Sequence, residues 1–299
     1  MRALVPCFAL LTLAACGGES GNNQFAGRSP EEIEAMMGQG SGGAPVDAGV
    51  GRGQAGAPGE ARTADELGLN CNAVAAQRGE GPDVAGVTIG MSADQALQKL
   101  ACSNRALRVA FSDQGGFTRP LPDGRRPRTT ITGEGPRERI VVALVGLPGQ
   151  ERVVTIRRNL EFAAGQEPVI TNTIAQLEQK YGALAHNPAE YGRWTGHSLR
   201  DANNRPIAPN DSLLGARCAL SVGMQAGPPD LQGDCGLAVS VDIRPSSSNE
   251  QLAGTLVVSM NNGAFGVQLV EAYRAHANGA AQQRDAQEVQ DAAGRRPTL

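Results

Sequence analysis

Residues 1–15 decide the compartment in which the rest of this chain folds, and therefore which bonds can hold the fold together. Met1 and Arg2 are followed by an apolar run from Ala3 to Ala15 that ends in small residues. A membrane-spanning helix needs roughly 20 apolar residues, and this run is shorter, as in a cleaved secretory signal. We therefore expect residues 1–15 to be a signal peptide, and the remaining chain to fold in an oxidising compartment.

The residues that end this segment resemble the lipoprotein signal of bacteria, in which small residues precede a cysteine that receives lipid. The motif here is Leu13-Ala14-Ala15-Cys16, followed by Gly17. The resemblance implies that Cys16 becomes the acylated first residue of the mature chain, where each buried methylene contributes about 0.8 kcal/mol to membrane binding. Gly17 rather than an aspartate follows the cysteine, which by analogy favours an anchor in the outer membrane, facing the periplasm. The alternative is an ordinary cleaved signal with a chance cysteine.

Residues 16–68 are predicted to form a flexible, glycine-rich linker behind the lipidated cysteine. Phe25 is their only aromatic residue, so the stretch cannot bury enough apolar surface to offset the entropy of ordering it. Residues 51–56 formally match the G-x-G-x-x-G nucleotide motif. That motif works only between a strand and a helix, and neither is expected here. We therefore predict no nucleotide and no cofactor.

The composition suits an exported protein with one moderate hydrophobic core. The chain has 299 residues, of which 40% are hydrophobic, and a net charge of -3. Nucleic-acid binding requires a basic face, which this charge balance does not predict. A metal site is not expected either, because the cysteines lack C-x-x-C spacing and the three histidines are scattered.

Four cysteines remain for disulfides once Cys7 leaves with the signal and Cys16 takes lipid. They allow three pairings. Pairs that are local in sequence each lie inside one expected structural module, and closing such loops contributes about 3 to 4 kcal/mol in the chain-entropy model. We therefore predict the bridges Cys71–Cys102 and Cys218–Cys235.

The periodicity from residue 69 onward predicts an α+β fold with an antiparallel sheet and helices packed on one face. Residues 84–89 are predicted to form a strand, and Met91 to Gln95 then form a capping box that begins a helix. Ile140 to Val145 are typical of a buried strand, and Pro148-Gly149 of the turn that follows it. These elements make a first unit of one helix and several strands.

Pro168 is predicted to open the helix of a second unit of the same kind. The connection over residues 162–168 is short, which favours one continuous globular domain over residues 69–278, although it leaves open whether the two units share one sheet. The chain is then expected to end in a polar helical or disordered tail over residues 279–299.

Alternating apolar residues around the last two cysteines predict two strands of a hairpin. If Cys218 and Cys235 bridge this hairpin directly, its register places Val222 opposite Leu231.

The residues from Thr88 to Ala96, T-I-G-M-S-A-D-Q-A, resemble the strand-to-helix start of the SmpA/OmlA-type, BamE-like outer-membrane lipoproteins. The segment Lys180-Tyr181-Gly182 is similar to a helix end in uncharacterised proteobacterial envelope proteins. The first resemblance implies a helical layer over an antiparallel sheet and, as candidate partners, envelope or barrel-assembly proteins. This chain is longer than those lipoproteins and adds a second unit and two predicted disulfides.

No catalytic constellation is evident in the sequence, so we do not expect an enzyme. The expected function is that of a membrane-anchored periplasmic lipoprotein that acts as a protein-binding or scaffolding module of the cell envelope. Tyr191 and Trp194 are the predicted binding surface. The alternatives are a small-ligand or lipid-binding protein with a pocket near these two residues, and a purely structural envelope lipoprotein.

Overall fold

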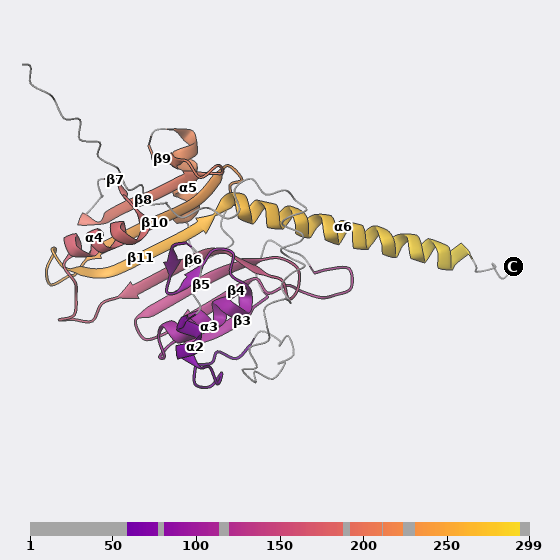
Figure 1. Cartoon of the computed structure of the whole chain (residues 1–299), viewed down its shortest axis with the longest axis horizontal. Coiled ribbons are helices and arrows are strands. Elements are labelled where there is room, and N and C mark those ends of the chain that lie inside the picture. The colour runs from indigo at the N-terminus through magenta and orange to yellow at the C-terminus, as the bar shows by residue number, and fades with distance from the viewer. Residues whose placement is uncertain are drawn as a thin grey trace, which may run out of the picture.

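The computed structural model describes residues 59–76, 81–113, 120–187, 192–210, 212–223 and 231–293. Its centre is a nine-stranded sheet in which all paired strands are antiparallel (Figure 1). The predicted α+β class and the antiparallel sheet are therefore confirmed. The predicted signal, Cys16 and the G-x-G-x-x-G stretch lie outside the described residues.

The strands of this sheet are joined mainly by turns and short helices. β1 and β2 form a small separate hairpin, and β9 pairs only with β8. In chain order the elements are α2 (Cys71–Ala76), β1 (Asp83–Val84), β2 (Val87–Thr88), α3 (Ala93–Ser103), β3 (Arg108–Ser112), β4 (Thr130–Glu134), β5 (Glu138–Val145), β6 (Arg152–Glu161), α4 (Ile170–Tyr181), β7 (Ala185–Asn187), β8 (Trp194–Asp201), β9 (Pro206–Ile207), α5 (Leu213–Gly223), β10 (Cys235–Pro245), β11 (Ala253–Asn262) and α6 (Gly263–Ala293).

Two units build the sheet, and each has a helix followed by four strands of the main path, with β9 and α5 inserted in the second unit between β8 and β10. The first unit runs from α3 through β3, β4, β5 and β6, and the second from α4 through β7, β8, β10 and β11. Across the sheet the order is β3-β4-β5-β6-β11-β10-β8-β7, so the last strands of the two units pair at the centre. The two units therefore share one sheet.

Both units fix the start of their helix with the same backbone hydrogen bonds. In each unit, the backbone amide of the first helical residue donates to a carbonyl one or two residues before the unit's last strand. A backbone amide at the start of that strand donates in return to a carbonyl two residues before the helix. The four bonds are Ala93 to Glu151 (3.1 Å), Val153 to Met91 (2.9 Å), Ile170 to Gln251 (2.9 Å) and Ala253 to Pro168 (2.8 Å). This repetition indicates two copies of one structural module.

The helices divide between the two faces of the sheet. α3 and α4 pack on one face, as expected, where Leu100 of α3 meets Ile140, Val142 and other buried strand residues. α5 and the first turns of α6 pack on the other face, where Phe265 of α6 meets Val145. Because side chains alternate along a strand, neighbouring residues of β5 contribute to the two different cores.

The turns that the sequence predicted are largely present. Ser92 caps α3 with the complete capping box to Gln95, and Gly149 has a φ of 83°, as the third residue of a type II turn requires. Residues 84–89 differ from the single strand that was predicted. They contain the β1–β2 hairpin, whose turn residues Ala85 and Gly86 have φ of 54° and 78°.

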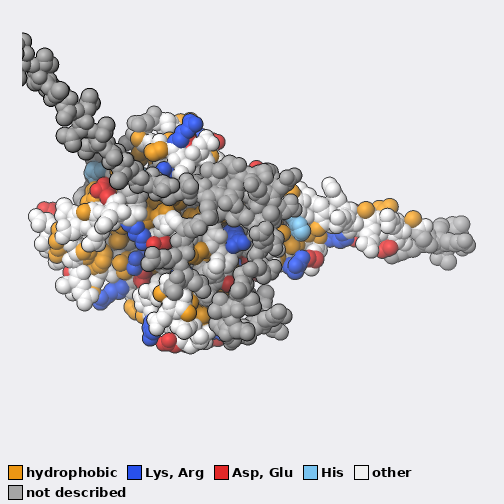
Figure 2. Space-filling model, in the orientation of Figure 1, with side chains coloured by type: hydrophobic (Ala, Val, Ile, Leu, Met, Phe, Trp, Pro, Cys, Tyr) orange, Lys and Arg blue, Asp and Glu red, His pale blue; other side chains and the backbone are white. Residues whose placement is uncertain are grey.

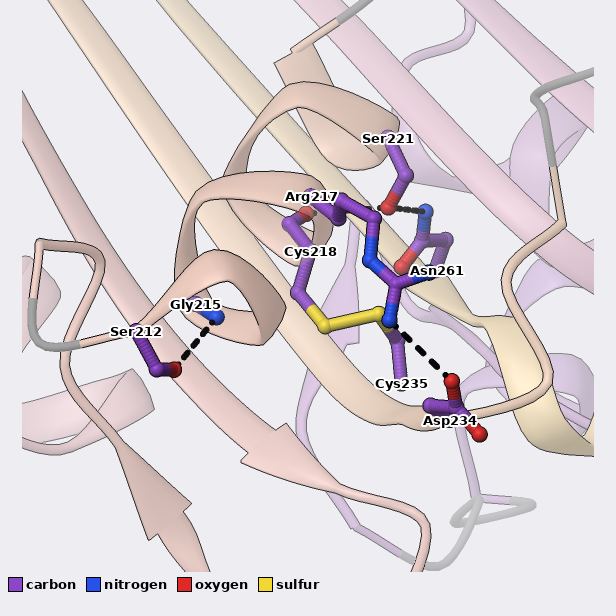
Figure 3. The surroundings of a disulfide bond; sticks show 8 residues. All are labelled: Ser212, Gly215, Arg217, Cys218, Ser221, Asp234, Cys235 and Asn261. Atoms are coloured by element: carbon purple, nitrogen blue, oxygen red, sulfur yellow. Dashed lines mark hydrogen bonds and ion pairs between the residues drawn. A yellow bond between two sulfur atoms is a disulfide. The ribbon is translucent and has the colours of Figure 1, made fainter.

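Both predicted disulfides are present, with Cα–Cα distances of 5.2 Å for Cys71–Cys102 and 5.6 Å for Cys218–Cys235. The predicted hairpin around the second bridge is wrong, because Cys218 lies in α5 rather than in a strand (Figure 3). α5 packs across the sheet, so the bridge ties a helix to the first residue of β10. The register that was to place Val222 opposite Leu231 therefore does not exist.

The C-terminal helix α6 has 31 residues and leaves the body after its first turns (Figure 1). Phe265, Leu269 and Tyr273 are buried against the body. Beyond them the helix extends away from the sheet, and its visible side carries separate apolar and charged patches (Figure 2).

Candidate functional site

The face of the sheet that carries α5 and α6 is the candidate site, because these helices cover only part of it. They pack near the ends of β10 and β11 that carry Cys235, Ala238 and Asn261. Over the rest of the inner strands the side chains are mostly polar and partly exposed. We call this surface the polar sheet face, and it comprises Arg157, Asn159, Val257, Ser259, Ser240, Asp242, Arg244, Arg193, Thr195 and His197.

The strand register arranges these side chains in two rows that cross four strands. Members of a row sit side by side on β6, β11, β10 and β8, and all point to the same side of the sheet. The rows are Arg157, Ser259, Ser240 and His197, and then Asn159, Val257, Asp242 and Thr195. Because strands of a sheet hold their side chains in a fixed frame, the polar sheet face is a preformed surface.

Asp242 is the acidic centre of this surface. Arg193 donates a hydrogen bond to its Oδ2, and the Nε of Arg244 lies 3.9 Å from its Oδ1. The carboxylate is only 13% exposed, whereas the two arginine side chains are 46% and 62% exposed. The positive charges therefore lie nearer to solvent than the negative charge.

Arg157 adds a third guanidinium to the same surface from β6. Its pKa lies below the usual value, first because it is partly buried and then because Arg193 and Arg244 place positive charge nearby. The three arginines share this face with two carboxylates, those of Asp242 and Glu161, because Glu161 pairs with Thr255 and Thr255 pairs with Arg244. An exposed guanidinium can bind anionic groups, since arginine presents several donors in a rigid fork.

Several polar atoms of this face are buried and have no hydrogen-bond partner among the residues that the structure describes. They include Asn159 Oδ1, Asp242 Oδ1 and His197 Nδ1. Burial lowers the pKa of His197 below its usual value, so its ring is neutral near pH 7 and one ring nitrogen can accept a hydrogen bond. A buried acceptor without a partner costs about 1 to 3 kcal/mol.

Trp194 does not belong to this face. It begins β8 on the opposite side of the sheet, where its ring stacks on His186 with the centroids 5.6 Å apart. A side chain on Gly196 would overlap the indole, so glycine leaves the room that the tryptophan needs. Tyr191 lies outside the described residues. The predicted pair therefore stays a prediction, and the polar sheet face is a different surface.

A pocket of about 230 Å³ lies where α6 leaves the body, between Leu121 and His276. Trp194 is not among the residues that line this pocket. The alternative function of small-ligand binding was expected to use a pocket near Trp194. Among the residues that the structure describes, no group of three or more His, Cys, Asp or Glu side chains could hold a metal ion.

Sequence reasoning missed the arginine cluster because its members are scattered. Arg157, Arg193 and Arg244 belong to different strands or strand ends, and only the pairing of β6, β11, β10 and β8 brings them together. A local signal was present in β6, where Thr155, Arg157 and Asn159 alternate with apolar or paired residues. That alternation predicts a strand with one polar face.

Comparison of the chain with protein-family models, with curated proteins and with solved structures found no match. Within the described ranges, no helix combines the length and the apolar character needed to cross a membrane.

Proposed function

We propose that this chain is a lipid-anchored periplasmic protein of the outer membrane that binds another envelope protein and performs no catalysis. The motif that ends at Cys16 supports the anchor. The two disulfides support an oxidising compartment, because such bonds persist mainly outside the cytoplasm. The resemblance of residues 88–96 to SmpA/OmlA-type lipoproteins supports an envelope role.

The observation that carries the binding function is the polar sheet face itself. Its exposed arginines lie on or directly beside paired strands, and several of its acceptors are buried with no partner in the described part of the chain. Arginine is enriched among the residues that dominate protein interfaces, and rigid elements position such residues better than loops do. A broad preformed surface of this composition fits a protein partner better than it fits a small molecule, which prefers a concave site.

Site-specific photo-crosslinking in living cells tests this function. A photoreactive amino acid replaces Val257 on the polar sheet face or Thr255, which pairs with Arg244 beside it. Gln176 and Gln179 on the exposed side of α4 serve as matched controls. We expect one discrete adduct with an envelope protein from the two β11 positions and none from the two α4 positions.

Adducts of equal yield from both sets of positions would contradict the proposal, as would adducts from α4 alone. The natural anchor must be kept in this experiment, because it holds the protein at the membrane where the partner is expected.

A further inference from the structure

We propose that the outer side of α5 docks on the surface of the lipid bilayer, as a second membrane contact beside the anchor. This inference rests on the anchor at Cys16 that the proposed function includes, and it adds how the folded body meets the membrane. It is carried by Leu213 and Leu220, which α5 holds out into solvent. We call these two residues, together with Ala216 between them, the leucine stripe.

α5 is apolar on both of its sides. Toward the sheet, Cys218 and Val222 are buried among residues of β8 and β10. On the other side Leu213 and Leu220 are 78% and 66% exposed, and they lie about two turns apart with Ala216 between them. Of the four large apolar side chains that are exposed in the described part of the chain, two belong to this one helix. Because a helix that is apolar all round is normally buried all round, the outer side of α5 has the composition of a contact surface.

The body of the protein holds the leucine stripe in this orientation. The Cys218–Cys235 disulfide joins the inner side of α5 to the first residue of β10, and the Asn261 side chain of β11 donates a hydrogen bond to Ser221. Figure 3 shows Cys218 and Ser221 on the side of the helix that faces the sheet. The stripe lies on the other side, so whatever covers it comes from outside the fold.

The size of the leucine stripe favours a bilayer over a protein. A specific protein interface takes about 20 to 30 residues from each partner, whereas the stripe consists of two leucines and one alanine. Each leucine that leaves water strengthens association about tenfold, which is too little to join two molecules that are free in solution. It is enough for a body that an anchor already keeps beside the bilayer, because the second contact is then intramolecular.

The charges beside the leucine stripe do not select a lipid headgroup. Arg217 lies between the two leucines in sequence, and its guanidinium pairs with Asp234 at 3.2 Å. Since this pair adds no net charge, the apolar side chains drive the docking. Such a helix lies in the plane of the membrane interface, with its leucines among the lipids and its arginine head toward water. We therefore expect docking that depends little on lipid charge or on salt.

Fluorescence quenching by labelled lipids tests the inference. The full lipidated protein is reconstituted in phosphatidylcholine vesicles that contain lipids with a nitroxide on the acyl chain. A fluorescent amino acid replaces Ala216 in the leucine stripe, or Gln176 on the exposed side of α4 as the matched control. We expect severalfold stronger quenching at position 216 than at position 176. The difference should persist when phosphatidylglycerol replaces part of the phosphatidylcholine and when salt rises.

Matched variants locate the contact. Leu213→Ser with Leu220→Ser should weaken docking about hundredfold, since each leucine contributes about tenfold, and should lower the quenching at position 216 to the level at position 176. The control, Val169→Ser with Val289→Ser, removes two exposed apolar side chains elsewhere and should leave the quenching unchanged. Leu220→Ser alone serves if the first double variant does not fold, and it should weaken docking about tenfold.

Equal quenching at the two positions would overturn the inference, and so would equal effects of the two double variants. Quenching that requires phosphatidylglycerol and disappears in salt would also overturn it, because charge rather than apolar surface would then hold α5. Flotation of the same vesicles reports the anchor separately. Protein that does not float with the vesicles would refute the anchor and the docking together. Protein that floats but shows equal quenching would leave the proposed function standing and remove only the contact of α5.

Discussion

Glu151 shows how one buried charge can hold two distant parts of the chain together. Its side chain is 1% exposed and accepts hydrogen bonds from the backbone amide and the guanidinium of Arg128. Arg128 in turn binds Asp94 at the start of α3 and lies over the ring of Phe111. The loop before β4 is thereby fixed to the helix and to the sheet. Burial lowers the pKa of Arg128, but the hydrogen bonds and charges of the two carboxylates together raise that pKa above its usual value.

Removing one partner of this pair leaves the other charge buried. We predict that Arg128→Met lowers the free energy of unfolding by about 3 to 5 kcal/mol, the usual loss when a buried ion pair is broken. The double variant Arg128→Met with Glu151→Gln should regain part of that loss, since no uncompensated charge remains. Urea denaturation measures both values. Arg125→Met, in an exposed pair with Asp123, is the control, and an equal loss there would contradict the account.

His197 makes stability depend on pH. Burial lowers its folded pKa below the value near 6.5 that it has when unfolded, so the unfolded chain binds the proton more readily. Its contribution to stability is therefore present at pH 7 and is lost as the pH falls from about 6.5 through the folded pKa. We predict that His197→Gln reduces the fall in the urea midpoint between pH 7 and pH 5. His276→Gln, on the exposed part of α6, should retain the natural slope, and parallel curves for all three proteins would refute the prediction.

At the scale of single residues, the sequence identifies cysteines and caps but not ion pairs across the fold. Ser92 and Gln95 lie three residues apart, and their pairing follows from helix geometry alone. Arg193 and Asp242 are 49 residues apart, and only the register of β8 and β10 brings them into contact. The candidate site consists almost wholly of pairs of this second kind, which explains why it was not predicted.

Among the elements, α5 is one whose type the sequence predicted wrongly, because a strand was expected around Cys218. Its residues, L-L-G-A-R-C-A-L-S-V-G, are apolar at so many positions that a period of two and a period of 3.6 both fit. The fold uses the helical period, because Cys218 and Val222 lie one turn apart and are both buried. Gly215 approaches the carbonyl of Ala208 so closely that a side chain there would clash with backbone. Arg217 of the same helix forms an ion pair with Asp234, next to the disulfide (Figure 3).

The Cys218–Cys235 bridge should stabilise the attachment of α5. The bridge closes a sequence separation of 17 residues, for which the chain-entropy model gives about 3 kcal/mol. We predict that Cys218→Ser with Cys235→Ser lowers the free energy of unfolding by about this amount while Cys71–Cys102 stays oxidised. Urea denaturation of the double variant under non-reducing conditions measures the loss, and an unchanged midpoint would show that packing alone holds α5.

For the whole molecule, the sequence predicts the class of fold and the presence of two units but not the way they join. The capping box, the hairpin turn and the helix after Pro168 are local signals, and each corresponds to an observed element. The pairing of β6 with β11 is not local, because it joins strands about 100 residues apart and creates the centre of the sheet. The polar sheet face spans that junction, so the site arises from the same long-range pairing.

The anchor gives a prediction for the complete protein. If Cys16 carries lipid, the protein purified from its natural membrane should begin at Cys16, and the fragment that contains Cys16 should carry the added mass of acyl chains. Cys16→Ser should instead yield a protein without added acyl mass, which is released from membranes by salt washing. Intact-protein mass spectrometry of both forms decides the matter, and an unacylated natural protein that still contains residues 1–15 would refute the anchor.

Arginine footprinting in the native membrane tests the central claim, that a partner protein covers the polar sheet face. Phenylglyoxal modifies exposed arginines, and mass spectrometry of the fragments reports the extent at each position. We predict that Arg193 and Arg244 react severalfold more slowly in isolated outer membranes than in the purified protein, whereas Arg105 and Arg274 react equally in both, since they are exposed elsewhere. Equal reactivity of Arg193 and Arg244 in the two preparations would contradict the account.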